Sequence, residues 1–261
     1  MQAIHNPKVE LRYWVIIYLV SVFGTNMGDL AVRYFRLWST ASFPELAPLA
    51  HAGPLPFLIL LALVIFVIER FSRVTTEFFF WAIILLIRTL ATNIADFLID
   101  DFHMHPAVLM IVISGLLAFF AYKWVARAGP ELRCSGKLTS DSFYWVCMLL
   151  AGVLGTIAGD VLWHLFGLAL ASAVLSAIMA SIVFVGHSRF LLNPLLYWIG
   201  IVMARVSGTA VGDWISHSAK SGGADLGLPV ATLASGVIFV AVTLLWKPKT
   251  SVHAFADAER L

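Results

Sequence analysis

The stretch YWVIIYLVSVFGTNMGD, Tyr13 to Asp29, begins as an apolar helix and ends in threonine, asparagine and aspartate. Three later stretches align with it without a gap: FWAIILLIRTLATNIAD at 80–96, YWVCMLLAGVLGTIAGD at 144–160 and YWIGIVMARVSGTAVGD at 197–213. Four copies at one spacing identify an internal repeat. A second apolar segment follows each copy, so the repeated unit is a pair of helices.

The composition indicates an integral membrane protein. The 261 residues are 61% hydrophobic and 12% charged, whereas roughly 25% of a typical soluble domain is charged, and the mean hydropathy is +0.91. A net charge of +2 without a basic aromatic patch argues against nucleic-acid binding. Cys134 and Cys147 form no metal or disulfide motif. The first apolar segment lacks the features of a cleavable signal peptide and is expected to stay in the mature protein.

Eight apolar segments are long enough to cross a bilayer core about 30 Å thick. The sequence predicts an all-α integral membrane protein with eight transmembrane helices in four parallel two-helix repeats, whose odd helices form an inner bundle. The predicted spans are approximately 12–35, 54–69, 77–99, 106–125, 142–164, 167–187, 195–216 and 228–246. The repeats are residues 1–73, 74–137, 138–190 and 191–261, together one membrane domain.

The distribution of basic residues predicts an orientation. The N-terminal and C-terminal segments and the connections after even helices hold 12 of the 17 Lys and Arg residues, against three on the opposite side. By the positive-inside rule, both termini are cytoplasmic. We expect a multi-pass protein of the bacterial inner (plasma) membrane.

Each copy carries a tryptophan in its second position. These residues are Trp14, Trp81, Trp145 and Trp198. On this pattern the chain resembles a bacterial integral membrane family of four tandem two-helix repeats with one tryptophan each, catalogued as a repeat of unknown function. The resemblance covers the whole chain and implies the architecture but no activity. The tryptophans are expected to anchor the protein at the interface or to pack between repeats.

Small residues recur ten and fourteen positions after each tryptophan. They are Gly24 and Gly28, Ala91 and Ala95, Gly155 and Gly159, and Gly208 and Gly212. Small residues four apart let helix backbones approach closely, so we expect these positions to pack the inner bundle.

The polar part of each copy predicts a shared centre, because threonine and aspartate four residues apart lie on one helix face. The pairs are Thr25 and Asp29, Thr92 and Asp96, Thr156 and Asp160, and Thr209 and Asp213. Asn26 and Asn93 add amides in the first two repeats. Arg88 and Arg205 occupy one shared position in repeats two and four and are expected to compensate charge.

Four carboxylates and two guanidinium groups leave a formal charge of −2, which one divalent cation would cancel. Oxygen ligands of this kind suit Mn²⁺, Mg²⁺ or Ca²⁺. We therefore expect a transporter of a divalent metal, with Mn²⁺ favoured and with proton coupling through the carboxylates. The alternatives are a proton-coupled transporter of another small solute, a scaffold or sensor that binds without moving its ligand, and hydrogen bonding that only cross-links the helices.

A second group of polar residues is predicted on the outer side. It consists of Asp100, Asp101, His103 and His105, with His51, His164 and His217 elsewhere on that side. Such residues could bind a metal, relay protons or form a metal-dependent outer-face enzyme, and ordinary solvated loop histidines are the simpler alternative. The sequence holds no hydrolase elbow, zinc-protease motif or phosphate loop. It indicates no organic cofactor, and the expected partners are the lipid bilayer and a small cation or solute.

Overall fold

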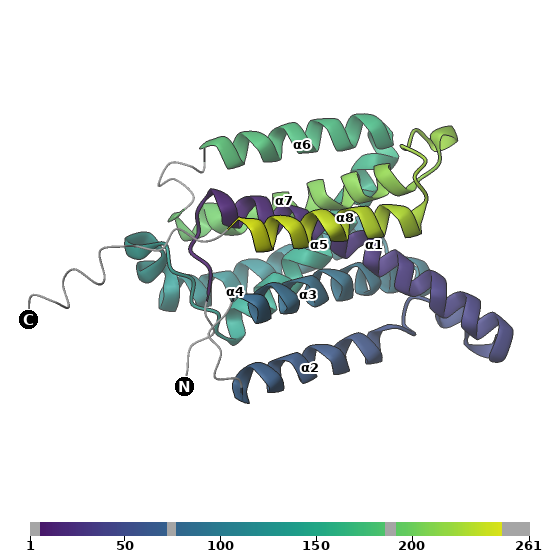
Figure 1. Ribbon diagram of the computed structural model, residues 1–261, viewed down its shortest axis with the longest axis horizontal. Coiled ribbons are helices and arrows are strands. Elements are labelled where there is room, and N and C mark those ends of the chain that lie inside the picture. The colour runs from purple at the N-terminus through teal and green to yellow at the C-terminus, as the bar shows by residue number, and fades with distance from the viewer. Residues whose placement is uncertain (1–5, 72–76, 186–191, 247–261) are drawn as a thin grey trace, which may run out of the picture.

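The structure is a computed structural model and describes residues 6–71, 77–185 and 192–246. This part of the chain forms eight α-helices that lie lengthwise beside one another, and it contains no β-strand (Figure 1). The helices are α1 (Leu11–Ser42), α2 (Leu55–Phe71), α3 (Phe78–Asp96), α4 (Pro106–Ser135), α5 (Ser142–Phe166), α6 (Leu168–Val185), α7 (Pro194–Ser216) and α8 (Leu228–Leu245). Short elements are the 3₁₀-helices η1 (Pro44–Leu49) and η4 (Ala219–Ser221) and the π-helix η2 (Phe97–Asp101).

The all-α fold class is confirmed. Within the described ranges, six helices are long and apolar enough to cross a membrane, namely α1, α4, α5, α7, α8 and α3 together with η2. Two apolar helices are shorter, at Leu55–Glu69 and Leu168–Phe184. The predicted repeat boundaries at 73/74 and 190/191 lie outside the described residues, as do the basic residues in 72–76, 186–191 and 247–261.

Two helices continue well past their predicted ends. The sequence predicts a connection after residue 125, but α4 runs to Ser135. Trp124, Ala128 and Leu132, four residues apart, are buried, and α4 packs on α5 and α7. This apolar stripe keeps the extension helical over the start of the inner helices. Likewise, α1 continues past the predicted residue 35 and projects beyond its neighbours (Figure 1).

The odd helices form a closed ring. Helix α1 packs on α3 and α7, and α5 packs on the same two helices from the opposite side. The even helices lie outside, where α2 packs on α3, α4 on α5, α6 on α7, and α8 on α1. Each even helix therefore packs most extensively on the odd helix of the following repeat, and α8 closes the circle. This arrangement interlocks the four repeats.

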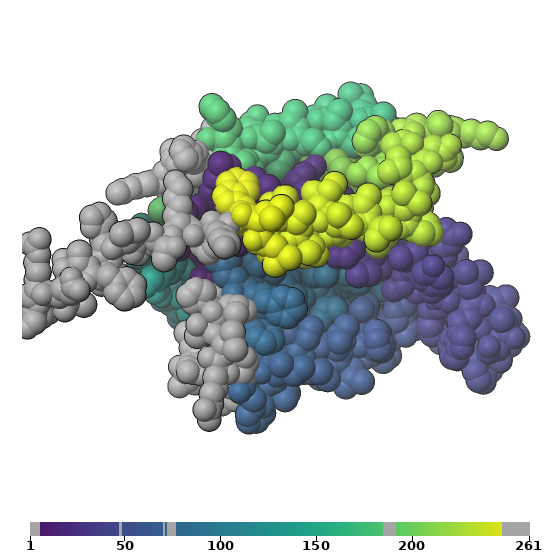
Figure 2. Space-filling model, viewed as in Figure 1, coloured from purple at the N-terminus to yellow at the C-terminus, as the bar shows by residue number. Residues whose placement is uncertain are grey.

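The outer helices present apolar side chains to the surroundings, and α6 and α8 are visible at the molecular surface in Figure 2. Exposed leucine, valine, isoleucine and phenylalanine side chains follow α2, α6 and α8 along their lengths. Monomeric soluble proteins rarely expose contiguous apolar surfaces this large. The surface is therefore compatible with a multi-pass membrane protein.

Close contacts between small residues and the neighbouring helix explain the tight ring. A Cβ atom added to Gly24 would lie 2.5 Å from the Cβ of Arg88, and one added to Gly208 would lie 2.5 Å from the Cβ of Ser21. Such distances are shorter than side-chain contacts allow, so each glycine is needed for the observed helix spacing.

At one contact in the ring, between α3 and α5, the glycine and the larger residue have exchanged helices. Repeat two carries Ala91 where the other repeats have glycine, and repeat three carries Gly152 where the others have serine or arginine. These two residues face each other, since a Cβ on Gly152 would lie 2.6 Å from the Cβ of Ala91. In the other three contacts the glycine stands at the first of these positions and the larger residue at the second, whereas here Ala91 is the larger residue and Gly152 the glycine. The close spacing of α3 and α5 is therefore preserved.

Candidate functional site

Equivalent residues of the parallel inner helices meet at successive levels along the bundle. Near the helix starts, the hydroxyls of Tyr13, Tyr144 and Tyr197 form a triangle, which we call the tyrosine triangle. The Tyr13–Tyr197 oxygen distance is 2.6 Å, whereas Tyr144 lies 3.4 Å from Tyr13 and 3.2 Å from Tyr197. Phe80 fills the fourth equivalent position. The sequence shows an aromatic residue at this position in every copy, but the polar role of three of them was missed.

Indole rings surround the tyrosine triangle. Of the four repeat tryptophans, Trp14, Trp81 and Trp198 are buried and Trp145 is partly buried. Trp124 of α4 adds a fifth ring, stacked on Tyr197 with centroids 5.8 Å apart and planes 26° apart. This aromatic layer closes the bundle at what we call the tyrosine end, so these tryptophans pack between helices.

Arg205 occupies the middle of the bundle and is fully buried. Its guanidinium donates hydrogen bonds to the hydroxyls of Thr92 and Thr156, the latter at 2.8 Å. It also donates to the backbone carbonyls of Ser21 at 3.0 Å and Arg88 at 3.2 Å. The structure thus places a protein cation among two of the threonines predicted as ion ligands.

The other two predicted threonines lie at the same level. The hydroxyls of Thr25 and Thr209 are 3.4 Å apart. Thr25 also donates to the carbonyl of Ser21 at 3.2 Å, the intrahelical bond typical of a threonine in an apolar helix. We call the four residues Thr25, Thr92, Thr156 and Thr209 the threonine layer.

Arg88 stands at the equivalent position in repeat two but has different partners. Its Nη2 atom lies 4.0 Å from the sulfur of Met148, one turn toward the tyrosine end. Met148 lies four residues after Tyr144 on α5, so this contact directs the guanidinium toward the tyrosine triangle. The Nε and Nη1 atoms are buried and have no hydrogen-bond partner in the part of the chain that the structure describes.

The two asparagines lie against neighbouring inner helices. The Asn93 amide, oriented to satisfy its hydrogen bonds, donates to the carbonyls of Gly28 and Thr89 at 3.2 Å. The Asn26 side chain lies beside Gly212, where an added Cβ would be 3.4 Å from its Oδ1 atom. Both amide atoms of Asn26 are buried and have no hydrogen-bond partner within residues 6–71, 77–185 and 192–246.

One turn beyond the threonine layer lie four carboxylates, which we call the aspartate ring: Asp29, Asp96, Asp160 and Asp213. Asp213 is 6% exposed and the other three are partly exposed. The carboxylates act on one another and on Arg205 electrostatically. In the described ranges, none of the four is in an ion pair within 4.0 Å. The same ranges contain no ready-made group of three or more His, Cys, Asp or Glu side chains that could hold a metal.

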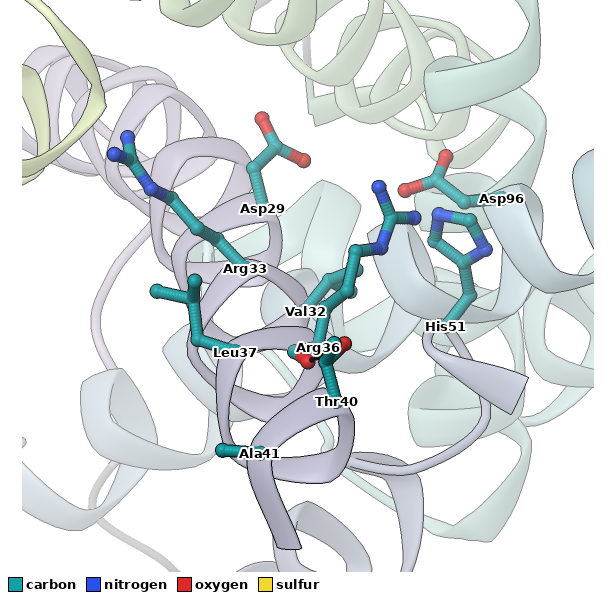
Figure 3. Close-up of a pocket in the computed structure, with 9 residues that line it drawn as sticks. All are labelled: Asp29, Val32, Arg33, Arg36, Leu37, Thr40, Ala41, His51 and Asp96. Carbon is teal, nitrogen blue, oxygen red and sulfur yellow. Dashed lines mark hydrogen bonds between the residues drawn. The ribbon is translucent and has the colours of Figure 1, made fainter. Parts of the chain in front are cut away.

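A pocket of about 540 Å³ opens onto the aspartate ring. Figure 3 shows Asp29 and Asp96 at its border, with the Arg36 guanidinium directed toward Asp96 and His51 and the Arg33 guanidinium on the side of Asp29. The remaining lining residues are Val32, Leu37, Thr40 and Ala41. Carboxylates from repeats one and two are therefore reachable from this end, which we call the aspartate end.

The outer polar group divides into two parts. His51, which lines the pocket, places its Nδ1 atom 2.8 Å from Asp101 Oδ1, and its Nε2 atom lies 3.8 Å from Asp100 Oδ2. The π-helix η2 carries both aspartates, and π-helical turns occur often at functional sites. The sequence predicts these residues on one side of the membrane, but their pairing depends on the loop before α2 and was not predictable.

The other outer histidines lie at helix ends. His105 accepts a hydrogen bond from the Ala107 amide at the start of α4. His164 and His217 donate from Nδ1 to the carbonyls of Asp160 and Asp213 at 2.7 and 2.8 Å. His103 is exposed, with a positive φ of 53°. These four histidines therefore do not gather around one point with His51.

Comparison with known families identifies one part of the chain. Residues 196–248 match the family described as Repeat of Unknown Function (DUF347). The matched segment contains the fourth copy of the motif and α8. The match confirms the predicted resemblance to a catalogued repeat of unknown function. No curated protein and no solved structure matches the chain.

Proposed function

We propose that the protein is a multi-pass protein of the bacterial inner membrane, with eight spans and cytoplasmic termini. The apolar side chains on α2, α6 and α8 support this proposal, because a bilayer would cover them. The tyrosine end would then face the cytoplasm and the aspartate end the outside. The shorter helices α2 and α6 would cross a locally thinned part of the bilayer.

Within this setting, we propose that the protein transports a divalent cation, with Mn²⁺ favoured, through the aspartate ring. The main support is that the four largely buried carboxylates of the aspartate ring lack an ion pair among the described residues. The nearby Arg205 donates its hydrogen bonds to threonine hydroxyls and backbone carbonyls instead. Burying unpaired carboxylates is costly, and such residues commonly mark ion pathways. Hard divalent cations prefer oxygen ligands of this kind.

The two ends of the bundle would differ in access. A cation entering through the pocket would reach Asp29 and Asp96 first, and the four carboxylates would turn toward it. Passage to the tyrosine end would require Arg205 to leave the threonine layer and the aromatic layer to open. Protonation of the carboxylates would release the cation, because carboxylate ligands bind metal in the deprotonated form.

Mn²⁺ uptake into proteoliposomes tests this function. Single Asp→Asn changes at positions 29, 96, 160 and 213 should each reduce uptake by at least about tenfold, since even groups behind the ligands change metal affinity 10–100-fold. Asp225→Asn is the matched control, because Asp225 is exposed and its positive φ of 61° suits asparagine equally. Uptake no faster than in empty vesicles, or equal in all variants, would exclude the proposal.

A second candidate is proton-coupled transport of a small zwitterion. The pocket volume lies within the range of small-molecule sites, and Arg33 and Arg36 line it together with Asp29 and Asp96. A carboxylate of the solute would bind the guanidinium groups and its ammonium group the aspartates. Arg36→Gln distinguishes the candidates, because it should lower zwitterion uptake but leave or raise uptake of a bare cation. The alternative of an outer-face metal-dependent enzyme stays a prediction.

A further inference from the structure

Arg88 is fully buried, and no carboxylate of the described residues lies within ion-pair distance of it. Among the same residues its Nε and Nη1 atoms have no hydrogen-bond partner, and its Nη2 atom has the thioether of Met148 at 4.0 Å. A thioether is a weak acceptor and carries no charge. A guanidinium keeps its charge far more readily than other basic side chains, so the site needs compensation from elsewhere.

The inner helices supply no carboxylate on this side of the threonine layer. Residues 11–28, 78–95, 142–159 and 194–212 contain neither aspartate nor glutamate. The acidic residues nearest to these ranges, Glu10, Glu77 and Asp141, stand at the helix starts, and Glu77 pairs with Arg12. Arg88 is therefore a fully buried positive charge in an apolar part of the bundle, where an unpaired charge is costly.

The nearest polar level to the Arg88 guanidinium on the tyrosine side is the tyrosine triangle. Arg88 contacts Met148, which lies four residues after Tyr144 on α5. Within the triangle, Tyr13 and Tyr197 make the short bond of 2.6 Å, whereas Tyr144 has only longer contacts of 3.4 and 3.2 Å. The Tyr144 hydroxyl, which can donate as well as accept, is therefore the one most free to donate to a further group. An anion would accept hydrogen bonds from the guanidinium and from this hydroxyl.

We propose that Arg88 and the tyrosine triangle bind a small monovalent inorganic anion of chloride size. One negative charge neutralises one guanidinium, and the complete burial of Arg88 and of the three tyrosines favours a small ion over an organic acid. The anion serves as a fixed counter-ion that holds α1, α3, α5 and α7 together at the tyrosine end. This inference concerns the opposite half of the bundle from the aspartate ring and does not depend on cation transport.

Thermal denaturation of the purified full chain in detergent tests the proposal, with sodium gluconate replaced by sodium chloride at constant ionic strength. Saturating chloride should raise the denaturation temperature of the wild type by about 5 °C, as expected for a ligand well above its Kd. Tyr144→Phe should raise the half-saturating chloride concentration about tenfold, because charge-assisted hydrogen bonds are the strong ones. Lys220→Gln, which removes an exposed cation, should respond as the wild type does.

Arg88→Met should abolish the response to chloride. If that variant does not fold, crystals grown in bromide provide the decisive measurement, because an anomalous peak is expected within hydrogen-bond reach of Arg88 and Tyr144. Equal denaturation temperatures in chloride and gluconate, a chloride response that persists in Arg88→Met, or bromide crystals with no peak at Arg88 would each overturn the proposal. None of these outcomes would change Mn²⁺ uptake by the wild type. Failure of the anion proposal can therefore be distinguished from failure of the transport function.

Discussion

Arg88 and Arg205 occupy the same position of the repeat and are both fully buried, yet their surroundings differ. Arg205 points toward the threonine layer and donates to two hydroxyls and two carbonyls. Arg88 points toward the tyrosine triangle, and no oxygen of the described residues accepts a hydrogen bond from its guanidinium. A repeated sequence has therefore produced two sites of unlike chemistry. The protein itself supplies hydrogen-bond acceptors for Arg205, whereas in our proposal a bound anion supplies them for Arg88.

The largest expected effect comes from removing the compensated arginine. Arg205→Met leaves the hydroxyls of Thr92 and Thr156 without the guanidinium donor and removes a fully buried cation from the threonine layer. We expect a loss of about 3–5 kcal/mol in the free energy of unfolding, the usual result of breaking a buried charged network. Denaturation of the purified protein measures the loss.

Arg88→Met provides the matched comparison in chloride-free buffer. Replacing an unpaired buried charge with an apolar side chain of similar length should change stability by less than about 1 kcal/mol, or increase it. If Arg88→Met and Arg205→Met lost equal free energy of unfolding, the difference between the contacts of the two arginines would be contradicted.

The next effect concerns the helix spacing that holds Arg205 in place. A Cβ on Gly155 would lie 2.5 Å from Cγ and 2.6 Å from Cβ of Arg205. Gly155→Ala should therefore cost about 1–3 kcal/mol through overpacking. Gly115→Ala in α4 is the control, because nothing lies within 4 Å of its added Cβ. Similar stabilities for the two variants would contradict the close approach of α5 and α7.

The exchanged pair offers a sharper test of the same packing. Gly152→Ala should destabilise by about 1–3 kcal/mol, because the new methyl would meet Ala91. The double variant Gly152→Ala with Ala91→Gly should recover most of that loss, since it returns the methyl to one helix only. A double-mutant cycle measures the coupling, and a coupling energy near zero would contradict the pairing.

The smallest effect lies in the tyrosine triangle. Tyr13→Phe removes the 2.6 Å bond to Tyr197 and should cost about 1 kcal/mol in chloride-free buffer, the usual contribution of a neutral hydrogen bond. Tyr144→Phe should cost less there, because its contacts are longer. Phe80 already fills the fourth equivalent position, so the ring shape is tolerated. The opposite order of the two costs would contradict the hydroxyl geometry.

Much of the fold could be predicted because the repeat aligns without gaps. The spacing of tryptophan, small residue, threonine and aspartate located the helices, and the small residues at Gly24 and Gly208 indicated close packing. The lengths of α1 and α4 could not be read from hydropathy alone, because charged residues fall within both extensions. In α4, Trp124 and Leu132 keep the helix packed where the charges suggested a loop.

The chemistry of the centre was harder to predict. Spacing placed Arg88 and Arg205 on the polar face but could not give their directions, since a long side chain can extend either way along a helix. The His51–Asp101 pair joins a loop to a π-helix, and neither element belongs to the repeated motif. Repetition therefore predicts where backbones lie, whereas the unique residues decide what each level of the bundle can bind.

The proposed transport function requires that the aspartate ring, which makes no ion pair among the described residues, binds a cation. Equilibrium binding of Mn²⁺ to the purified chain measures this, with the bound metal counted per chain at several pH values. We predict one Mn²⁺ per wild-type chain, weaker binding as the pH falls, and loss of the ion in Asp29→Asn but not in Asp225→Asn. Wild-type protein that binds no Mn²⁺, or an Asp29→Asn variant that binds it equally well, would contradict cation binding at the aspartate ring.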